Sequence, residues 1–538
     1  MRLLENGTYV IEIDNRLLEL TKKEKELKVS EDEFRAALKG YKFDESLIAL
    51  AEISAKLFDR KFTENTVWKK EKTGFIIHKP TKQFVTDFAV EYIANILLTS
   101  GSNNFKSESI KNKDNIVALF SIYHNSIIQP IGRPNSISSI LVPMFYQQIT
   151  SQQDVKDVFV RQWLIFQKSQ ELVDEKEKID LDQILIQKSG MSVIEYIKLC
   201  FLILAVILTR PRFNFGTFEN STISGLNDVL NSQKISAILK QLSATQNEFI
   251  ELDKKYNSQL KPEYTRSRYN PLWEKPIIVL GDNDYVVPSL SAYVKGAIRG
   301  LYWIFENSKG KSFRDYFGTL FEEYCGMVIR DIFGAENVRS GIKFGKENKE
   351  FFDWIVDNKG EIILFETKGY QFPLNTLQTG DPKLIRKEVF GKLVETIKQT
   401  YQRCQDVHKN EELKEFKNKK ITVIGVFYDI PLVSTSLYDS DIKLALEGLS
   451  STYPGIKDFK HIFLSIEELE SYAYVKDCIS IELLVNRVKN TAGSGVLSEI
   501  SKVFKENNLS PEQHKNLLDK KFKDFYNQEL GIPYSEKE

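Results

Sequence analysis

The residues best suited to chemistry in this chain are an aspartate, a glutamate and a lysine in two neighbouring apolar segments. Asp353 interrupts the apolar run 351–356, and Glu366 and Lys368 end the apolar run 362–368. Side chains alternate between the two faces of a strand, so Glu366 and Lys368 are expected to share one face. Two carboxylates and an ammonium are costly to bury without a purpose. Hydrolysis of a phosphodiester with a divalent metal ion is one such purpose.

The turn between the two apolar segments is expected to bring these charged residues together. Residues 358–360 (Asn-Lys-Gly) are typical of a turn, so the segments should form a β-hairpin with Asp353 beside Glu366. Each group also has an ordinary structural interpretation. Asp353 could pair with an arginine at a strand end, and Glu366 with Lys368 could be a surface ion pair that stabilises little. The apolar neighbours on both sides argue against an ordinary solvated face.

The segments around this hairpin predict a mixed α/β fold. The periodicity indicates a helix, three strands, a long helix and a further strand, over residues 312–333, 337–344, 351–357, 361–368, 384–405 and 421–428. This order, α-β-β-β-α-β, is typical of a mixed α/β unit.

A chain of 538 residues is longer than one compact domain usually is, so several domains are expected. Apolar residues recur at three- and four-residue spacing over 1–261, which predicts a large, mainly α-helical N-terminal domain for targeting, regulation or assembly. Residues 262–309 are expected to form a β-hairpin and a connecting helix. The α/β domain should span 310–490, and a charged helical tail should span 491–538.

The composition excludes several classes of protein and of site. Lys plus Arg number 74, as do Asp plus Glu, so any nucleic-acid contact must come from a local patch such as 371–420, with eleven basic and seven acidic residues. The four cysteines lie far apart, which argues against a zinc site or disulfide framework and fits a reducing cytosol. The five histidines are scattered. Any metal should therefore have oxygen ligands, as Mg²⁺ and Mn²⁺ do.

No stretch of the sequence predicts a membrane span or a signal peptide. The first residues turn polar at once. The most apolar run, 199–208, is about half of the roughly 20 residues that a span requires, so it is expected to be a buried core helix. We therefore expect a cytoplasmic protein without membrane contact.

The order of elements and the placing of the charged residues resemble the PD-(D/E)XK superfamily, the restriction-endonuclease-like nucleases. The resemblance covers about residues 310–430, less than a quarter of the chain. That family has a glutamate on the helix before the sheet, an aspartate on the second strand and a Glu-x-Lys triplet on the third. Here Gly318-Thr319-Leu320-Phe321-Glu322, Asp353 and Glu366-Thr367-Lys368 resemble these three motifs. Phe352 stands where the family name has proline, a residue that does no chemistry.

The resemblance implies a role for each residue of the motifs. Asp353 and Glu366 would hold Mg²⁺ or Mn²⁺, together with the backbone carbonyl of Thr367. Lys368 would position or deprotonate the attacking water, or stabilise the charge that builds up on the phosphate. Glu322 would contact a metal-bound water or help to hold a second ion.

Two choices in the helices remain open from the sequence. Glu322 and Glu323 lie at opposite margins of the apolar face of the first helix, and only the Gly-x-x-Phe-Glu spacing favours Glu322. In the long helix, Gln399 lies almost opposite the apolar stripe and is expected to face solvent, whereas Gln402 and Gln405 lie nearer to its margin. Neighbouring basic residues of that helix, Arg403 among them, could hold backbone phosphates or simply form a solvated face.

The residues and the resemblance together predict a Mg²⁺-dependent endonuclease that hydrolyses DNA in prokaryotic defence against phage or plasmid. The layout looks like that of restriction and anti-phage defence effectors, in which a nuclease module is fused to a sensing or scaffold region. The sequence has no phosphate-binding ATPase loop, so a partner protein would supply sensing or ATPase function, and a homodimer or larger assembly is expected. The alternatives are a catalytically weak nucleic-acid-binding or scaffold subunit, and a nuclease that acts on RNA.

Overall fold

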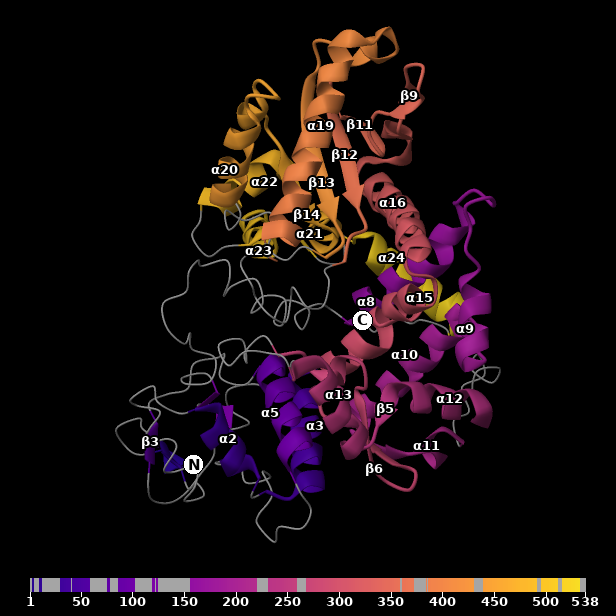
Figure 1. The fold of residues 1–538 in the computed structure, drawn as a ribbon, viewed down its shortest axis with the longest axis vertical. Coiled ribbons are helices and arrows are strands. Elements are labelled where there is room, and N and C mark those ends of the chain that lie inside the picture. The colour runs from indigo at the N-terminus through magenta and orange to yellow at the C-terminus, as the bar shows by residue number, and fades with distance from the viewer. Residues whose placement is uncertain are drawn as a thin grey trace. The chain divides into compact units, whose positions relative to one another are not determined.

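The computed structural model of the protein divides into two compact units, each built from several stretches of the chain (Figure 1). Unit 1 consists of Met1–Pro134, Gln147–Val158 and Asp182–Ile304, and unit 2 of Asn135–Tyr146, Phe159–Leu181 and Phe305–Glu538. The residues that the structure describes are 2–3, 9–11, 30–39, 41–58, 75–77, 86–101, 119–120, 122–123, 155–219, 231–258, 268–358, 360–371, 384, 386–429, 439–490, 495–510 and 515–532.

Unit 1 is mainly helical. Its longer helices are α2 (Glu31–Leu38), α3 (Phe43–Phe58), α5 (Asp87–Ser100), α9 (Leu181–Ser189), α10 (Val193–Thr209), α12 (Ser232–Leu242) and α13 (Gln246–Asn257). Capping boxes begin α2, α10 and α13, where Ser30, Ser192 and Thr245 accept hydrogen bonds from the backbone N–H three residues later. The hydrophobic core of the unit includes Leu50 of α3 and Ile93 of α5.

The β-hairpin predicted before residue 290 is confirmed, and it belongs to a four-stranded sheet of unit 1. Strands β6 (Ile277–Gly281) and β7 (Asp284–Val286) pair antiparallel across a turn in which Asn283 has a φ of 55°. Asparagine tolerates this left-handed conformation better than most residues do. Strands β4 (Arg212–Asn214) and β5 (Ser243–Ala244) complete the order β4-β7-β6-β5.

The remaining elements of unit 1 are short. They are β1 (Arg2–Leu3), β2 (Tyr9–Ile11), β3 (Phe75–Ile77), α11 (Gly216–Glu219), η6 (Pro271–Trp273), α14 (Leu290–Tyr293) and η7 (Val294–Arg299). The apolar run 199–208 lies in α10, whose side chains are largely buried, as expected. In the described ranges no single helix is long and apolar enough to cross a membrane, and α9 and α10 reach that length only as a pair bent by 57°.

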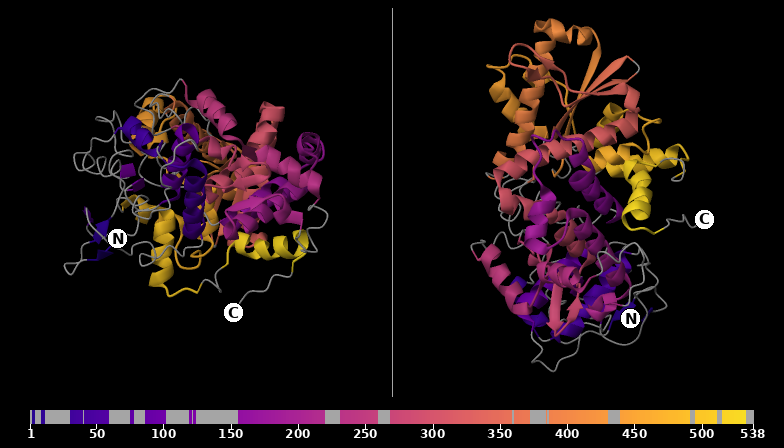
Figure 2. Two further views of the ribbon diagram at one scale, coloured as in Figure 1. Left: turned by 90° about the horizontal axis from the view of Figure 1, so that it is seen from below. Right: turned by 90° about the vertical axis from the view of Figure 1, so that its right-hand side faces the viewer.

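Unit 2 is built around a five-stranded mixed sheet with the strand order β14-β13-β12-β11-β8 (Figures 1 and 2). The strands are β8 (Val338–Ser340), β11 (Trp354–Asn358), β12 (Glu361–Lys368), β13 (Lys420–Phe427) and β14 (Ile462–Ser465). The first three are antiparallel, whereas β12, β13 and β14 run parallel. Parallel neighbours need a crossover connection, and α19 (Gly391–Lys409) supplies it between β12 and β13.

Helices α16 (Lys311–Phe333) and α19 cover opposite faces of this sheet. The ring of Phe365 on β12 lies 6.1 Å from that of Phe333 on α16. Leu364, which directly precedes Phe365 on β12, belongs instead to the hydrophobic cluster that contains Val407 of α19. Because side chains alternate along a strand, Glu366 lies on the α19 face and Thr367 on the α16 face.

Two glycines let α16 lie close against the sheet. A Cβ atom at Gly326 would come within 2.2 Å of the ring of Trp354, the first residue of β11. A Cβ atom at Gly369, directly after β12, would meet the Cα of Gly318 at 3.2 Å. The indole nitrogen of Trp354 also donates a hydrogen bond to the backbone carbonyl of Glu322, at 3.0 Å. These contacts fix the part of α16 that carries Glu322 beside the start of β11.

The predicted order α-β-β-β-α-β is seen in unit 2, with three differences. The expected first strand, 337–344, is divided into β8 and β9 (Lys343–Phe344), and β9 pairs with β10 (Lys349–Glu350) in a small separate hairpin. Strand β14, which pairs with β13, was not predicted. The long helix starts with a π-helical turn, η9 (Arg386–Phe390), before α19.

The segment after residue 158 packs within unit 2, although the sequence predicts it to be part of the N-terminal domain. Arg161 is buried at the end of α8 (Val155–Trp163) and forms two hydrogen bonds with Glu470, at 2.7 and 2.6 Å. The hydroxyl of Tyr324 on α16 donates to the same carboxylate at 2.5 Å. The Gln162 side chain donates to the hydroxyl of Tyr428 at 2.9 Å. These buried contacts tie the segment to the sheet and its helices.

The other elements of unit 2 lie before α16 and after β12. They are η2 (Leu164–Lys168), η3 (Ser169–Glu171), α15 (Leu301–Lys309, which begins at the edge of unit 1), η8 (Ala335–Asn337), η10 (Glu411–Phe416), α20 (Asp439–Leu449), η12 (Ile456–Asp458), α21 (Ile466–Tyr472), α22 (Ile481–Asn490), α23 (Val496–Glu506), α24 (Leu517–Asp524) and η13 (Phe525–Glu529). The expected charged tail contributes to the core, since Leu518 and Phe525 are buried.

Candidate functional site

Asp353 lies directly before β11 and is held by the neighbouring strand. Trp354 pairs with Phe365, so the register sets Asp353 opposite Glu366, one position beyond the last paired residues. Asp353 Oδ2 accepts hydrogen bonds from the backbone N–H of Thr367 at 2.6 Å and from its hydroxyl at 2.8 Å. The hairpin predicted to join these residues is therefore present. Thr367, expected to offer its carbonyl to a metal, is seen to orient Asp353 through its N–H and hydroxyl.

Glu366 is buried between two cations. Only 1% of the residue is exposed. Its Oε1 accepts a hydrogen bond from Lys368 Nζ at 2.7 Å, which confirms that these two side chains share a face. Its Oε2 forms an ion pair with Nη1 of Arg403 from α19. The guanidinium of Arg403 also lies over the ring of Phe352, 5.7 Å from its centroid.

Arg403 is the site residue that sequence reasoning did not assign. It was grouped with the basic residues of the long helix, and no contact with Glu366 was expected. A signal is nonetheless present, because Thr396, Thr400, Arg403 and Val407 recur at helical spacing and the two threonines and the valine are buried. Each threonine hydroxyl donates to a carbonyl of its own helix, at 2.9 Å for Thr396 and 2.8 Å for Thr400. Threonines that bond in this way can extend a buried face, and Arg403 lies on that extension.

The structure places Glu322, rather than Glu323, beside the two carboxylates. Burial and repulsion from nearby carboxylates, Asp353 first, raise the pKa of Glu322 to about 8. The pKa of Glu323 is also raised by burial, but the charge that acts on it is the favourable one of Arg330. Of the two neighbours that the sequence left open, Glu322 is therefore the one that faces the site.

Burial also raises the pKa of Asp353, to about 7. Repulsion from Glu366 adds to the increase, whereas the hydrogen bonds from Thr367 and the charge of Lys368 oppose it. Asp353 and Glu366 thus repel each other, and the charges of both raise the pKa of Glu322. Close, buried carboxylates of this kind are stabilised by an added cation, because each carboxylate raises the energy of the others.

The donor atoms suit a hard divalent cation such as Mg²⁺ or Mn²⁺, which prefers carboxylate and carbonyl oxygens. Asp353 Oδ2 is held by Thr367, and Oδ1 accepts no hydrogen bond from any described residue. Both oxygens of Glu366 are occupied by cationic side chains. Within the described residues, no three His, Cys, Asp or Glu side chains are arranged to hold a metal ion as they stand. Each oxygen of Glu366 keeps a second lone pair, so the donor set suits a cation, but both oxygens lie beside cationic side chains that an added cation would repel.

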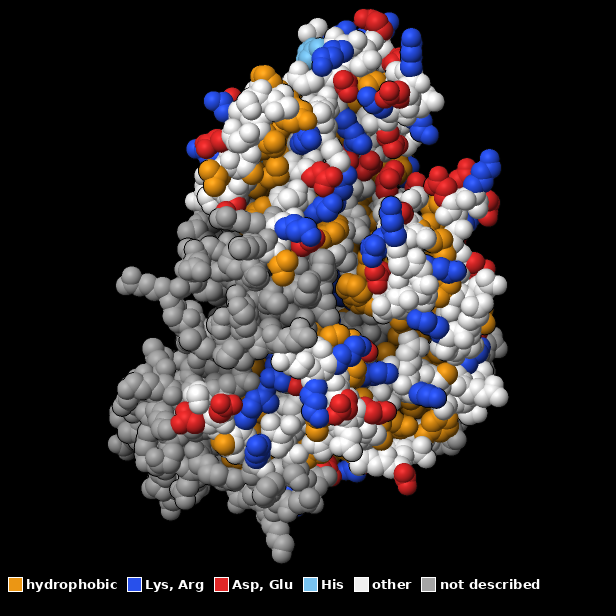
Figure 3. All heavy atoms as spheres, in the orientation of Figure 1, with side chains coloured by type: hydrophobic (Ala, Val, Ile, Leu, Met, Phe, Trp, Pro, Cys, Tyr) orange, Lys and Arg blue, Asp and Glu red, His pale blue; other side chains and the backbone are white. Residues whose placement is uncertain are grey.

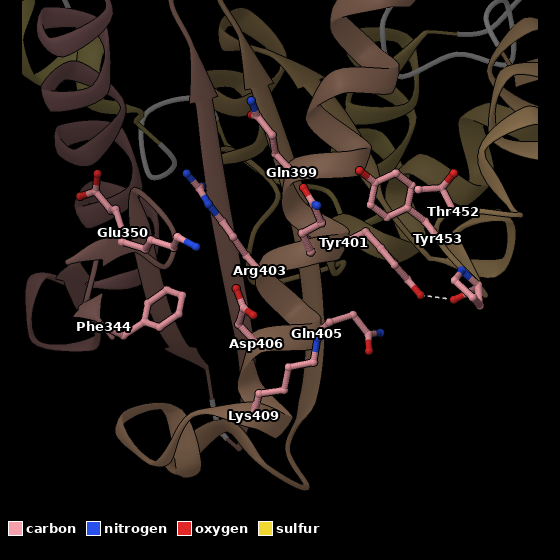
Figure 4. A pocket seen from close by; sticks show the side chains of 13 residues that line it. Phe344, Glu350, Gln399, Tyr401, Arg403, Gln405, Asp406, Lys409, Thr452 and Tyr453 are labelled. Atoms are coloured by element: carbon pink, nitrogen blue, oxygen red, sulfur yellow. Dashed lines mark hydrogen bonds between the residues drawn. The ribbon is translucent and has the colours of Figure 1, made fainter. Parts of the chain in front are cut away.

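A pocket of about 730 Å³ lies along α19, and Arg403 is among the side chains that line it (Figure 4). The side chains that line it belong to α19, the β9–β10 hairpin and the loop after α20. They are Phe344, Lys349, Glu350, Gln399, Tyr401, Gln402, Arg403, Gln405, Asp406, Lys409, Thr452, Tyr453 and Pro454. Glu350 and Arg403 connect the pocket to the site, because Glu350 raises the pKa of Glu322 and Arg403 pairs with Glu366.

Gln399 lines this pocket and does not face open solvent as expected. The residue is half-buried, and its Oε1 atom is buried without a hydrogen-bond partner among the described residues. The buried face of α19 is wider than its apolar stripe because Thr396 and Thr400 belong to it. Gln402 and Gln405 are exposed at the rim of the pocket.

The surface around the site carries both signs of charge. On the face shown in Figure 3, acidic and basic side chains are interspersed over the described part of unit 2.

Comparison of the chain with protein-family models, with curated proteins and with solved structures finds no match.

Proposed function

We propose that unit 2 is a metal-dependent nuclease of the PD-(D/E)XK kind, which hydrolyses phosphodiester bonds of DNA. The observation that supports this most is the meeting of Asp353, Glu366 and Lys368 at one end of the β11–β12 hairpin. Glu322 lies beside them on the preceding helix. The elements that carry these residues follow the order of the superfamily that the sequence resembles.

The chemistry follows from the groups that these side chains present. Asp353 and Glu366, with the carbonyl of Thr367, would hold Mg²⁺ or Mn²⁺, which supplies positive charge against the charge that develops on the phosphoryl oxygens. Lys368, whose side chain is 30% exposed, presents its ammonium beside Glu366, where it can orient the attacking water. Glu322, with a pKa of about 8, can hold or release a proton near neutral pH.

The pocket beside the carboxylates supports a nucleic-acid substrate. It has side chains that bind phosphates or donate hydrogen bonds, namely Lys349, Gln402, Arg403 and Lys409, and the aromatic ring of Tyr453. Phosphate contacts of this kind position a nucleic acid, and an aromatic ring offers a surface on which a base can stack. DNA is the first candidate and RNA the second.

A different function is favoured by one observation, the ion pair of Arg403 with Glu366. If this pair is permanent, the carboxylates serve as an internal counter-charge, and unit 2 is a nucleic-acid-binding or scaffold module without catalysis. Lys368 and Asp353 would then have structural roles only. Metal binding separates the two functions, because a permanent pair keeps beside Glu366 a guanidinium that repels a divalent cation.

We propose for the whole protein a cytoplasmic role in prokaryotic defence against foreign DNA. The support is the layout, in which a unit with a candidate nuclease site is joined to a second compact, mainly helical unit. Unit 1 would then serve targeting, regulation or assembly. Cleavage of both strands requires two sites, so a homodimer or larger assembly, with a partner protein that senses the target or hydrolyses ATP, completes the proposal.

The proposed activity is tested with purified protein and a panel of substrates. Supercoiled plasmid, linear duplex, single-stranded DNA and RNA are incubated with Mg²⁺, Mn²⁺ or EDTA. We expect cleavage of DNA with either cation, none in EDTA, and a loss of cleavage in Asp353→Ala and Lys368→Ala. Cleavage by both variants at the wild-type rate would rule out this site. Binding without cleavage under every condition would support the scaffold function.

A further inference from the structure

We infer that Arg403 is an exchangeable phosphate-binding residue. It neutralises Glu366 while no divalent cation is bound, and it moves to a phosphate of the nucleic acid in the adjoining pocket once a cation occupies Glu366. The inference rests on the proposed function, since it assigns the substrate contact of the same site. It goes further by giving one residue two partners and by linking metal binding to substrate binding.

The contact of Arg403 with Glu366 joins an accessible cation to an inaccessible carboxylate. The side chain of Glu366 is 2% exposed and that of Arg403 is 24% exposed. Lys368 occupies the other oxygen of Glu366, at 2.7 Å. Each carboxylate oxygen of Glu366 thus already accepts one contact from a cationic group, and a divalent cation bound to either oxygen repels the group beside it.

Of the two cationic groups, Arg403 is the one whose side chain also lines the adjoining pocket. Lys368 lies two residues from Glu366 on the same strand, whereas Arg403 reaches Glu366 from α19 and lines the 730 Å³ pocket. Figure 4 shows its side chain extending from α19 toward the side of the pocket that carries Glu350. The movement that we infer is therefore a change of side-chain rotamer, from the carboxylate into the pocket that Arg403 already lines.

The pocket offers Arg403 an acceptor in its second position. Gln399 lies one helical turn before Arg403 on α19, and residues at this spacing are neighbours on a helix surface. Its Oε1 is buried and has no hydrogen-bond partner among the described residues. A buried acceptor without a donor is costly, and a guanidinium N–H released from Glu366 can satisfy it. Gln399 is accordingly a positioning residue for the displaced arginine.

The charges of the pocket explain why the displaced guanidinium is needed there. Besides Arg403, the charged residues of the lining are two cations, Lys349 and Lys409, and two anions, Glu350 and Asp406. Their charges sum to zero. A guanidinium freed from Glu366 makes the pocket net positive. The planar guanidinium presents N–H groups in a geometry that matches the oxygens of a phosphate. It also lies over the ring of Phe352.

The exchange is tested by measuring metal and nucleic-acid binding separately in Arg403→Gln. Mn²⁺ affinity is measured by electron paramagnetic resonance without nucleic acid, and affinity for a DNA duplex is measured in Ca²⁺ as a non-cleaving substitute. We expect Arg403→Gln to bind Mn²⁺ about tenfold more tightly, since no guanidinium lies beside Glu366 Oε2 to repel the cation, a change equivalent to about 1.4 kcal/mol. We expect DNA binding to weaken and its logarithmic salt dependence to fall by about one phosphate contact.

Lys409→Gln is the matched control. Lys409 is a cation of the same helix and pocket that forms no ion pair with Glu366. This variant should weaken DNA binding and leave Mn²⁺ affinity within about twofold of the wild type, since exposed charges at a distance are screened. If Arg403→Gln is unstable in EDTA, the gain in melting temperature on adding Mn²⁺ gives the same comparison, and it should be larger than in the wild type.

The outcomes separate this inference from the proposed function. Equal or weaker Mn²⁺ binding in Arg403→Gln, with normal binding in the wild type, overturns the exchange and leaves the nuclease proposal standing. No Mn²⁺ binding to either protein overturns both. Tighter Mn²⁺ binding with unchanged DNA binding overturns the assignment of the phosphate to Arg403.

Discussion

The indole nitrogen of Trp354 donates a hydrogen bond to the backbone carbonyl of Glu322, 3.0 Å away, and this contact joins the strand and the helix that carry the candidate site. The same indole ring lies against Gly326, so α16 approaches β11 closely one turn after Glu322. Trp354, which directly follows Asp353, therefore packs against the part of α16 that carries Glu322. The packing of this tryptophan thus helps to bring Glu322 close to Asp353, whose charge contributes to the raised pKa of Glu322.

We predict that Gly326→Ala disturbs the site through this packing. A Cβ atom there would meet the Trp354 ring at 2.2 Å, so helix or ring must shift. Overpacking of this kind costs about 1–3 kcal/mol in the free energy of unfolding, and we expect weaker Mn²⁺ binding as Glu322 moves. Chemical denaturation and Mn²⁺ titration measure the two effects.

Gly318→Ala is the control for this prediction, since it makes the same change on the same helix. A Cβ atom at Gly318 meets nothing within 4 Å. Alanine in a helix interior is favoured over glycine by about 0.5–1 kcal/mol, so this variant should be as stable as the wild type or more so. Equal destabilisation by both substitutions would contradict the packing account.

We predict that Thr367→Val weakens metal binding. The substitution removes the hydroxyl that donates to Asp353 Oδ2 at 2.8 Å and keeps the shape of the side chain and the backbone N–H. A group that orients a metal-binding carboxylate typically contributes about 10- to 100-fold to metal affinity, so Mn²⁺ affinity should fall about tenfold or more. Thr422→Val is the control, because Thr422 donates to Glu361 at 2.6 Å on the neighbouring strand, away from the site. A similar loss in both variants would show that the effect is not local to Asp353.

We predict that Glu322→Gln reduces cleavage and that Glu323→Gln does not. Glu322 is the glutamate that senses Asp353 and Glu366, and its pKa of about 8 allows proton exchange at neutral pH. Glu323 senses Arg330 instead. Loss of an acid–base group typically costs about 100-fold or more in rate, and cleavage of plasmid in Mg²⁺ measures it. A larger loss in Glu323→Gln would reverse the assignment.

We predict that the metal-free protein becomes less stable as pH rises from about 4 to about 8. In the folded state the pKa of Asp353 is raised to about 7 and that of Glu322 to about 8, above the values near 4 of an unfolded chain. The folded state therefore binds more protons than the unfolded state in this window. The stability is present below pH 4 and is lost as pH rises through the folded values, by up to about 1.4 kcal/mol per pH unit for each carboxyl.

Denaturation in EDTA at several pH values, followed by tryptophan fluorescence, measures this pH dependence. Asp353→Asn should reduce the slope by the contribution of one carboxyl, because an amide does not titrate, and should leave the contribution of Glu322. Asp357→Asn should not, since Asp357 is an exposed residue of the same strand. Stability that rises with pH over this window in the wild type would contradict the buried, mutually repelling carboxylates.

The sequence predicts the core of the site because that core is local. The apolar runs, the turn at 358–360 and the alternation of side chains suffice to bring Asp353 to Glu366 and Lys368. Helix α16 and strand β13 follow from periodicity in the same way. The helical wheel places Glu322 and Glu323 at opposite margins of one face, so only the Gly-x-x-Phe-Glu spacing favours Glu322 in the sequence, and the charges around the two residues in the structure agree with that choice.

The features that the sequence could not show depend on contacts between distant residues. Arg161 meets Glu470 across 309 positions, and this pair places the segment after residue 158 in unit 2. Strand β14 has only four residues and is defined by its parallel pairing with β13. Arg403 reaches Glu366 because the buried Thr396 and Thr400 widen the inner face of α19. A helical wheel that counts only apolar residues as buried does not include these threonines in that face.

Cleavage of a DNA duplex with Mn²⁺, compared between wild type, Asp353→Asn and Asp357→Asn, tests the central claim most directly. Both variants neutralise an aspartate at the β11 strand, but Asp353 is 8% exposed beside Glu366 and Asp357 lies exposed on the strand itself. The account predicts cleavage by the wild type and by Asp357→Asn, and a rate lower by at least about 100-fold in Asp353→Asn. Equal cleavage by all three proteins would contradict it.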